Sequence, residues 1–109
     1  MAQLAFHQAA IAGSNIVFTA ADAAGDTVLP DLDGGVLVRN ADTVAKTVTV
    51  VVPGNTRFGQ PDPDVAITVA AGETRLIGPL PQGLADPEDR LVHLTYSNVT
   101  ALTVAAVSI

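Results

Sequence analysis

Apolar and polar residues alternate along two neighbouring runs in the middle of the chain, residues 36–52, and a short polar connection separates the runs. In the second run, valine occupies positions 48, 50 and 52, and threonine occupies positions 47 and 49. Successive side chains of a strand point to opposite faces, so this pattern predicts a strand with one buried and one solvated face. Both residue types also suit a pleated surface, because their Cβ atoms are branched. Residues 36–52 are therefore predicted to form the central hairpin of an all-β domain.

Other short runs with strand character lie on both sides of this hairpin. Residues 65–78 predict a second hairpin, which turns at residues 70–73 with Gly72 at the tight position. Near the end of the chain, Val92, Leu94 and Tyr96 share one face of a predicted strand. The remaining predicted strands are residues 15–21, 26–29, 90–96 and 101–109.

Segments rich in Pro, Asp and Gly separate these strands and are predicted to be surface loops: residues 22–35, 53–64 and 78–89. Proline has no N–H to donate to a sheet, so segments that contain it are not expected to form the middle of a strand. Residues 1–13 combine helix-forming residues with apolar Leu4, Phe6 and Ile11, so a short helix, a first strand and an extended arm all stay open.

The number and spacing of these elements predict one all-β domain over residues 14–109, preceded by an arm or first element at residues 1–13. A chain of 109 residues has room for one core. Seven to eight short strands, with turns between them and no interior helix, predict a single-domain antiparallel β-sandwich. The pattern does not separate immunoglobulin-like from jelly-roll topology.

The composition predicts an unusual core, because 49% of the residues are hydrophobic and only 4% are aromatic. Most of the apolar residues are Ala and Val. Such side chains bury little area each, at about 25 cal/mol per Å² removed from water. Association with another protein would therefore add usefully to the stability of the fold.

The charge argues against two classes of partner. The net charge is −6, and the five cations are scattered along the chain. Nucleic acids and anionic membranes both require clustered Lys or Arg, so neither is an expected partner.

No apolar segment approaches the roughly 20 residues of a membrane span, and the N-terminus lacks the positive charge of a signal peptide. The chain has no cysteine, so disulfides and thiolate metal sites are excluded.

Three acidic segments are candidates for ligand binding. Asp31 and Asp33 have the spacing that begins a calcium loop, but the next residues supply no further oxygen ligands, which favours an acidic turn. Two other loops could pair carboxylates for glycosidic acid–base chemistry. Sugar sites usually add aromatic platforms, and the chain has one Tyr and no Trp, so solvated loops are favoured. The carboxylates of these loops are Asp62, Asp64, Asp86, Glu88 and Asp89.

The two histidines do not indicate catalysis. His93 alternates with Val92 and Leu94, which places it on the opposite, surface face of its predicted strand, and His7 lies in the N-terminal segment. A nucleophilic triad also needs an activated Ser or Cys and an orienting carboxylate. No nucleophile elbow, phosphate loop, dinucleotide fingerprint or metal-ligand spacing occurs. The chain is therefore predicted not to be an enzyme, and no cofactor or metal is expected.

Four segments carry a resemblance to a known group of proteins: AGDT at residues 24–27, VLVRN at 36–40, AGETRLIGP at 71–79 and LVHLTYSNVTALTVAA at 91–106. In these motifs the chain resembles small virion proteins encoded in the structural gene blocks of tailed bacteriophages and prophages, especially those of actinobacterial hosts. The resemblance spans nearly the whole chain beyond about Thr19. Its motifs are strand and turn patterns, so they are more specific for fold than for role.

The resemblance implies a capsid decoration or cement protein on the outer surface of the phage head, where it stabilises contacts between major capsid subunits. The implied partners are the major capsid protein and further copies of the chain, as a homotrimer. Close subunit packing would suit the small residues of the last strand, and residues 1–13 are the segment expected to reach a neighbour. The interface residues expected on this basis are Leu4, Phe6, Ile11, Val107 and Ile109.

A second interpretation is a module of a phage fibre or tail that binds carbohydrate or the host surface. It would use the loops at one end of the sandwich, residues 22–35, 57–64 and 79–89. The scarcity of aromatic residues argues against it.

Overall fold

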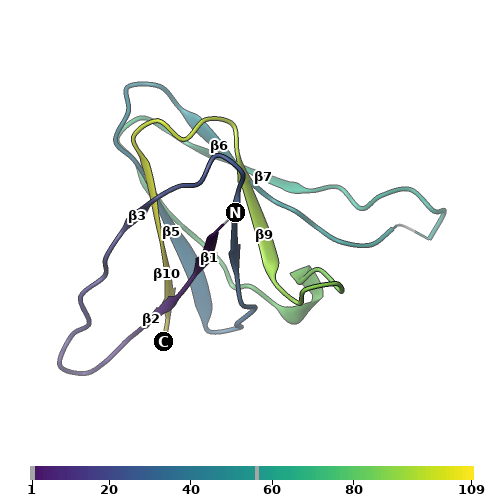
Figure 1. Ribbon diagram of the computed structural model, residues 1–109, viewed down its shortest axis with the longest axis horizontal. Coiled ribbons are helices and arrows are strands. Elements are labelled where there is room, and N and C mark those ends of the chain that lie inside the picture. Colours follow the sequence, from purple (N-terminus) through teal and green to yellow (C-terminus); the bar gives the residue numbers. More distant parts are fainter. Residues whose placement is uncertain (1, 56) are drawn as a thin grey trace.

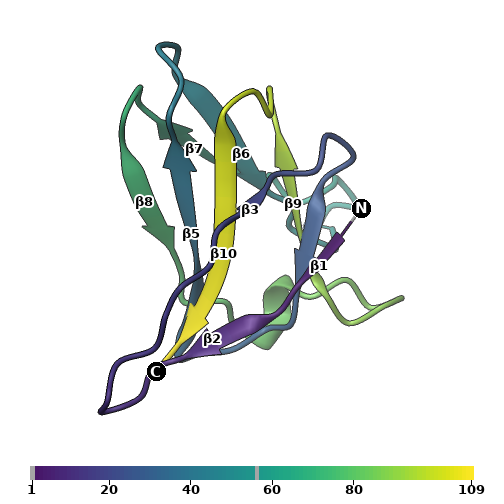
Figure 2. The same cartoon turned by 60° about the vertical axis from the view of Figure 1, so that its left-hand side comes forward.

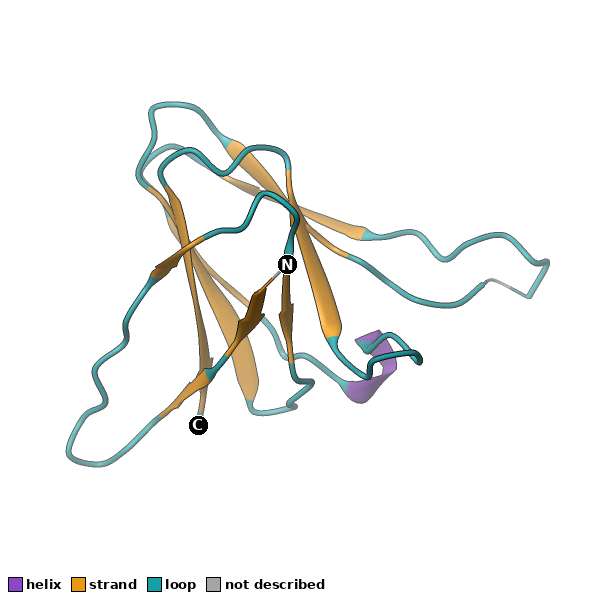
Figure 3. Ribbon diagram, in the orientation of Figure 1, coloured by secondary structure: helices purple, strands orange, loops and turns teal. Residues whose placement is uncertain are grey.

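Two β-sheets make up the protein and enclose one core between them (Figures 1 and 3). The computed structural model describes residues 2–55 and 57–109. The first sheet has the order β1 (Ala2–Leu4), β4 (Asp26–Val28), β9 (Val92–Tyr96), β6 (Lys46–Val50) and β7 (Val65–Val69). The second has the order β2 (Phe6–Gln8), β10 (Leu102–Ser108), β5 (Gly34–Asn40) and β8 (Thr74–Ile77), and β3 (Thr19–Ala20) also pairs with β10. The predicted β-sandwich is confirmed, with ten strands in place of seven or eight.

Helical structure plays a small part in this fold. A single 3₁₀ turn, η1 (Gln82–Leu84), lies in the loop before β9. Within the described residues, no helix has the length and apolarity needed to cross a membrane.

The N-terminal segment is part of both sheets. β1 pairs in parallel with β4, and β2 pairs in parallel with β10, so the chain passes from one sheet to the other at Ala5. Leu4 is buried and Phe6 packs against the core, because residues two apart in an extended chain share a face. Of the three alternatives for this segment, the first strand is correct. The sheets are therefore mixed, and the prediction of a purely antiparallel sandwich is wrong in this respect.

The predicted central hairpin is not a hairpin. β5 and β6 lie in different sheets, and residues 41–45 carry the chain across the sandwich between them. The prediction of which face is buried is nevertheless confirmed, since Val48 and Val50 are buried while Thr47 and Thr49 are half-buried. Period-two alternation fixes the inward face of a strand, but it is the same whether two strands pair within one sheet or face each other across a core.

The second predicted hairpin also crosses between sheets. The turn forms as expected, since the Glu73 N–H donates to the carbonyl of Ala70 at 3.0 Å and Gly72 has a φ of +74°, which glycine adopts at no steric cost. However, β7 pairs with β6, and β8 pairs with β5. The last two strands, β9 and β10, likewise lie in different sheets. The strand order also differs from the immunoglobulin order. The first two immunoglobulin strands share a sheet, whereas β1 and β2 of this protein lie in different sheets.

The predicted strand at residues 15–21 is shorter in the structure. Only Thr19–Ala20 forms a strand, and Ile16 and Val17 are exposed. Phe18 instead lies beneath the guanidinium of Arg39, whose Cζ is 4.3 Å from the ring centroid. In the described residues, the loops predicted at 53–64 and 78–89 are confirmed apart from the η1 turn, and residue 56 lies outside the described residues.

The core consists of small aliphatic side chains, as the composition predicts. Phe6 and Tyr96 pack against it while staying partly exposed. The buried members of the core cluster are Leu4, Ala21, Val28, Val36, Val38, Val48, Val50, Val69, Leu80, Val92, Leu94, Leu102, Val104 and Ala106.

Polar side chains stabilise the crossing between β5 and β6. The buried Asn40 amide donates to the carbonyls of Val44 at 2.9 Å and Val69 at 3.0 Å, which ties the crossing to β7 in the other sheet. Lys46 is also buried, and its Nζ lies 2.7 Å from a carboxylate oxygen of Asp42. This contact with Lys46 is the main reason that the pKa of Asp42 lies below its ordinary value. The crossing is thus fixed by satisfied buried polar groups.

A buried carboxylate lies between β4 and β9. Asp26 is 1% exposed, and its Oδ2 accepts a hydrogen bond from the Tyr96 hydroxyl at 2.6 Å. Burial, and then the neighbouring Asp26, raise the pKa of Tyr96, so this hydroxyl stays protonated and remains a donor. The other oxygen, Oδ1, has no hydrogen-bond partner among the described residues. The Tyr96 hydroxyl is therefore an important compensation for this buried charge.

Val50→Asp should unfold the protein, whereas Thr49→Asp should leave it folded. Val50 faces the core, and an unpaired buried carboxylate costs several kcal/mol, which is comparable to the total stability of a small domain of about 5–15 kcal/mol. Thr49 is on the solvated face of the same strand. Circular dichroism with thermal unfolding measures both variants. Loss of structure in both would contradict the assignment of the two faces.

Tyr96→Phe should destabilise the protein by about 1–3 kcal/mol, because it removes a donor from a buried carboxylate. Thr95→Val is the matched control, since it removes a hydroxyl from the neighbouring exposed position and should change the stability by about 0.5 kcal/mol or less. Urea unfolding of the three proteins measures the difference. Equal midpoints for the two variants would be evidence against the role of the Tyr96 hydroxyl.

Candidate functional site

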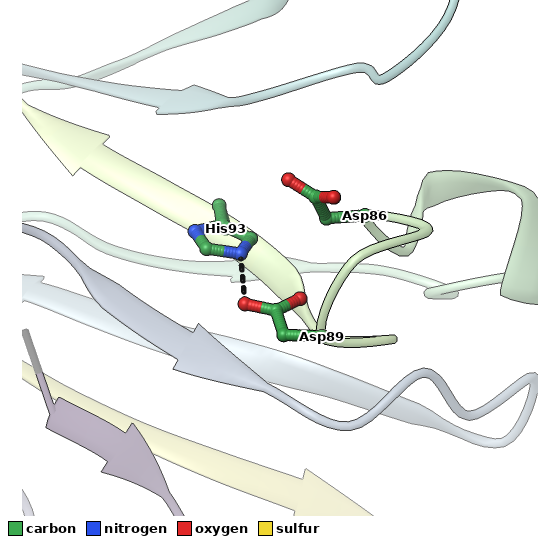
Figure 4. A group of neighbouring side chains, drawn as sticks. All are labelled: Asp86, Asp89 and His93. Atoms are coloured by element: carbon green, nitrogen blue, oxygen red, sulfur yellow. Dashed lines mark hydrogen bonds and ion pairs between the residues drawn. The ribbon is translucent and has the colours of Figure 1, made fainter.

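Two carboxylates and an imidazole meet where the chain enters β9 (Figure 4). One ligand atom from each of Asp86, Asp89 and His93 lies within 4.8 Å of the other two. Among the described residues, no other group of three or more such side chains is close enough to hold a metal ion. The sequence interpretation treated Asp86 and Asp89 as loop residues and His93 as a surface strand residue, and it did not predict that they meet.

The loop before β9 has a fixed conformation that positions these side chains. The Asp86 N–H donates to the Leu91 carbonyl at 2.9 Å, and the Arg90 N–H donates to the Asp86 carbonyl at 2.6 Å. The Leu91 N–H donates to Oδ1 of Asp89 at 2.9 Å, and the Glu88 N–H donates to Oδ1 of Asp86 at 2.9 Å. Each carboxylate therefore uses one oxygen to cap the loop, and the other oxygen of Asp89 contacts His93.

An ion pair accounts for the central contact of this cluster. Nε2 of His93 lies 2.7 Å from Oδ2 of Asp89, which is hydrogen-bond distance. Two ligands held at about 2.1 Å by one metal ion lie roughly 3 Å or more apart, so this pair is closer than a shared ion would leave it. The pKa of Asp89 is lowered, first by the Leu91 N–H and then by His93, as expected for a carboxylate that stays ionised. The arrangement fits a structural ion pair better than a preformed metal centre.

An apolar groove of about 650 Å³ lies at another part of the molecule, where β2 and the C-terminal end of β10 meet. Its walls include Ala9, Ala10, Ser14 and Ile16 from the segment after β2, the turn before β5 and the end of β8. Figure 2 shows the C-terminus beside β2, below the two sheets. Leu32, Leu76 and Ile109 line this groove and are 71%, 64% and 90% exposed. Asp33 also lines it, and its carboxylate makes no hydrogen bond or ion pair among the described residues.

The loop between β6 and β7 forms an arm that projects away from the sheets (Figure 1). The Asp62 N–H donates to the Gly54 carbonyl at 3.1 Å, and the Val52 N–H donates to Oδ1 of Asp64 at 2.9 Å. The two sides of the arm are thus joined along its length. Of the two acidic residues predicted as a possible catalytic pair, Asp64 joins the arm through its carboxylate and Asp62 through its backbone N–H. At the tip, Phe58 is 83% exposed, and the Arg57 guanidinium carbon is 5.3 Å from its ring centroid.

The structure places the predicted interface residues in three different environments. Leu4 is buried and Phe6 packs against the core of their own chain, so these two are structural residues. Val107 lines the groove and is half-buried, and Ile109 lines it and is exposed. Ile11 lies on the loop after β2 and is fully exposed. Sequence analysis missed Leu32 and Leu76, which occur in segments predicted as a turn and as a hairpin strand.

The remaining candidate residues have structural contacts. Asp31 accepts the N–H of Asp33 at 2.8 Å in the turn before β5, which matches the acidic turn favoured over a calcium loop. Nδ1 of His7 lies 2.9 Å from the Ala106 carbonyl, and its Nε2 lies 3.3 Å from the Val17 N–H. His7 therefore connects the loop after β2 to the neighbouring strand β10.

Asp89→Asn should lower stability at pH 7, because it removes the carboxylate that accepts the Leu91 N–H and lies 2.7 Å from Nε2 of His93. The lowered pKa means that the folded carboxylate binds a proton less readily than the unfolded one. Its contribution is therefore complete above about pH 4 and is lost as the pH falls through the folded value. Urea unfolding should show a difference between wild type and variant at pH 7 that shrinks progressively as the pH falls below about 4.

Glu88→Gln is the control for this measurement, because it changes a neighbouring exposed carboxylate of the same loop. It should have little effect at either pH. A difference between Asp89→Asn and wild type that is the same at both pH values would contradict the ion pair.

Comparison with known proteins finds no match to this chain among protein-family models, curated proteins or solved structures. The resemblance to small virion proteins therefore stays a prediction from the sequence motifs. The groove, the arm and the ion-pair cluster are the features on which a function can be argued.

Proposed function

We propose that this chain is a structural virion protein, a capsid decoration protein that binds the outside of a phage head and stabilises contacts between major capsid subunits. The observation that carries the proposal is the apolar groove, whose lining side chains Leu32, Leu76 and Ile109 are left uncovered by the chain itself. Contiguous apolar surface on a small soluble domain is typical of a protein-binding site.

The small-residue core supports the same role. A core of valine, leucine and alanine leaves a modest reserve of stability, and contact with a large assembly would add to it. A standard protein interface buries about 1,600 Å² in total. When such a contact is repeated over a symmetric shell, the stabilisation of the shell by each contact adds up over all its copies. A decoration protein acts through this contact area and needs no reaction centre.

The charge distribution supports an external position. The net charge of −6 disfavours contact with the packaged genome, whose phosphates require clustered cations. Two of the five cations are already paired within the chain, Lys46 with Asp42 and Arg75 with Glu73. Few free cations therefore remain for a nucleic acid.

The test is to mix the purified chain with empty heads assembled from the major capsid protein of the same genome and to image them by electron microscopy. We expect saturable density at symmetry-related positions on the outer surface, and heads that withstand a higher temperature. Binding only to tails or fibres would support the second interpretation, a fibre or tail module, and would overturn the proposal.

Leu32→Asp tests the groove in the same assay, because it introduces a charge on an exposed apolar side chain without disturbing the core. It should reduce occupancy of the heads at least tenfold. Val44→Asp is the matched control, since Val44 is 61% exposed and lies outside the groove, and it should bind like wild type.

A further inference from the structure

The arm carries an apolar and cationic tip that its own chain does not use. Phe58 is among the most exposed large apolar side chains, and Arg57 lies beside it with no ion-pair partner among the described residues. Hydrogen bonds join the two sides of the arm, and prolines 53, 61 and 63 restrict its backbone. These restraints on the described residues of the arm lower the conformational entropy that docking would cost.

The groove has the complementary chemistry. Its exposed wall is apolar at Leu32, Leu76 and Ile109, and Asp33 adds a carboxylate. No Lys or Arg lines it. A volume of about 650 Å³ lies within the range of about 300–1,000 Å³ that holds drug-sized ligands, so an aromatic ring with a neighbouring guanidinium can enter.

The arm does not reach the groove of its own chain. In Figure 1 the arm extends from β6 and β7 to the right, whereas β2, the loop after it and the C-terminus lie at the lower left. The longest extent of the molecule is 46 Å. The tip can therefore meet a groove only on another molecule.

We infer that the groove binds the arm of a second copy of this chain, with Phe58 against the apolar wall and Arg57 paired with Asp33. The contact places two different surfaces together, so it is heterologous and generates a ring or an open chain of copies. The trimer implied by the sequence resemblance corresponds to a ring that closes at three. The same groove carries the proposed function, so a groove that holds an arm is not free for a capsid subunit. The contact requires no capsid, so the isolated chain tests it separately from the experiment on heads.

A charge exchange tests the pairing. Light scattering and sedimentation equilibrium of the isolated chain should detect oligomers between micromolar and millimolar concentrations. Arg57→Asp and Asp33→Arg should each weaken association at least tenfold, and the double variant should restore most of it, because the exchanged charges again attract. Arg90→Asp, at an exposed arginine outside the groove, is the control and should associate like wild type.

Disulfide trapping tests the geometry, and the absence of native cysteine makes its background low. Phe58→Cys protein mixed with Leu32→Cys protein under mild oxidation should give a crosslinked dimer. Phe58→Cys mixed with Val44→Cys should give at least tenfold less, since Val44 lies outside the groove.

Three results would overturn the inference. The first is a strict monomer at all concentrations. The second is an oligomer that is unaffected by Arg57→Asp and Asp33→Arg, and the third is equal crosslinking of Phe58→Cys with both partners. All the changed side chains are exposed, so each variant is expected to fold. Circular dichroism of each variant checks this.

Discussion

The fold depends on the contact between the inner faces of two sheets, which is made almost entirely by valine, leucine and alanine. These side chains are short, so the two sheets need close and continuous packing to exclude water. Two short parallel strands at the N-terminus contribute to this, since Leu4 and Phe6 extend the core along the edges of both sheets. The N-terminal residues are therefore structural, although their composition alone is equally compatible with a free arm.

Buried polar groups determine the path of the chain through this apolar core. Asn40 and Lys46 are satisfied at the crossing between β5 and β6, where hydrogen bonds replace the contacts that a hairpin would have made. Asp26 is satisfied in part by Tyr96. Buried polar groups cost free energy in any arrangement that leaves them unpaired, so they favour this order of strands over others with the same hydrophobic pattern.

The surface divides into regions of different chemistry. In the cluster of Asp86, Asp89 and His93, each carboxylate accepts a backbone N–H of the loop before β9, and Asp89 and His93 form a structural ion pair. The groove and the tip of the arm expose apolar side chains that the chain leaves uncovered. Both of our proposals, binding to a capsid and binding to another copy, are argued from these apolar regions.

The sequence by itself determined the all-β class, the position of most strands and loops, and the inward face of strands such as β6 and β9, because alternation along one strand is a local property. Only the tertiary structure decided which strands pair. Residues 36–52 form strands as predicted, yet those strands lie in opposite sheets, since alternation is identical for paired and for facing strands. The groove likewise brings together Leu32, Leu76 and Ile109 from distant parts of the sequence, and no local pattern encodes that meeting.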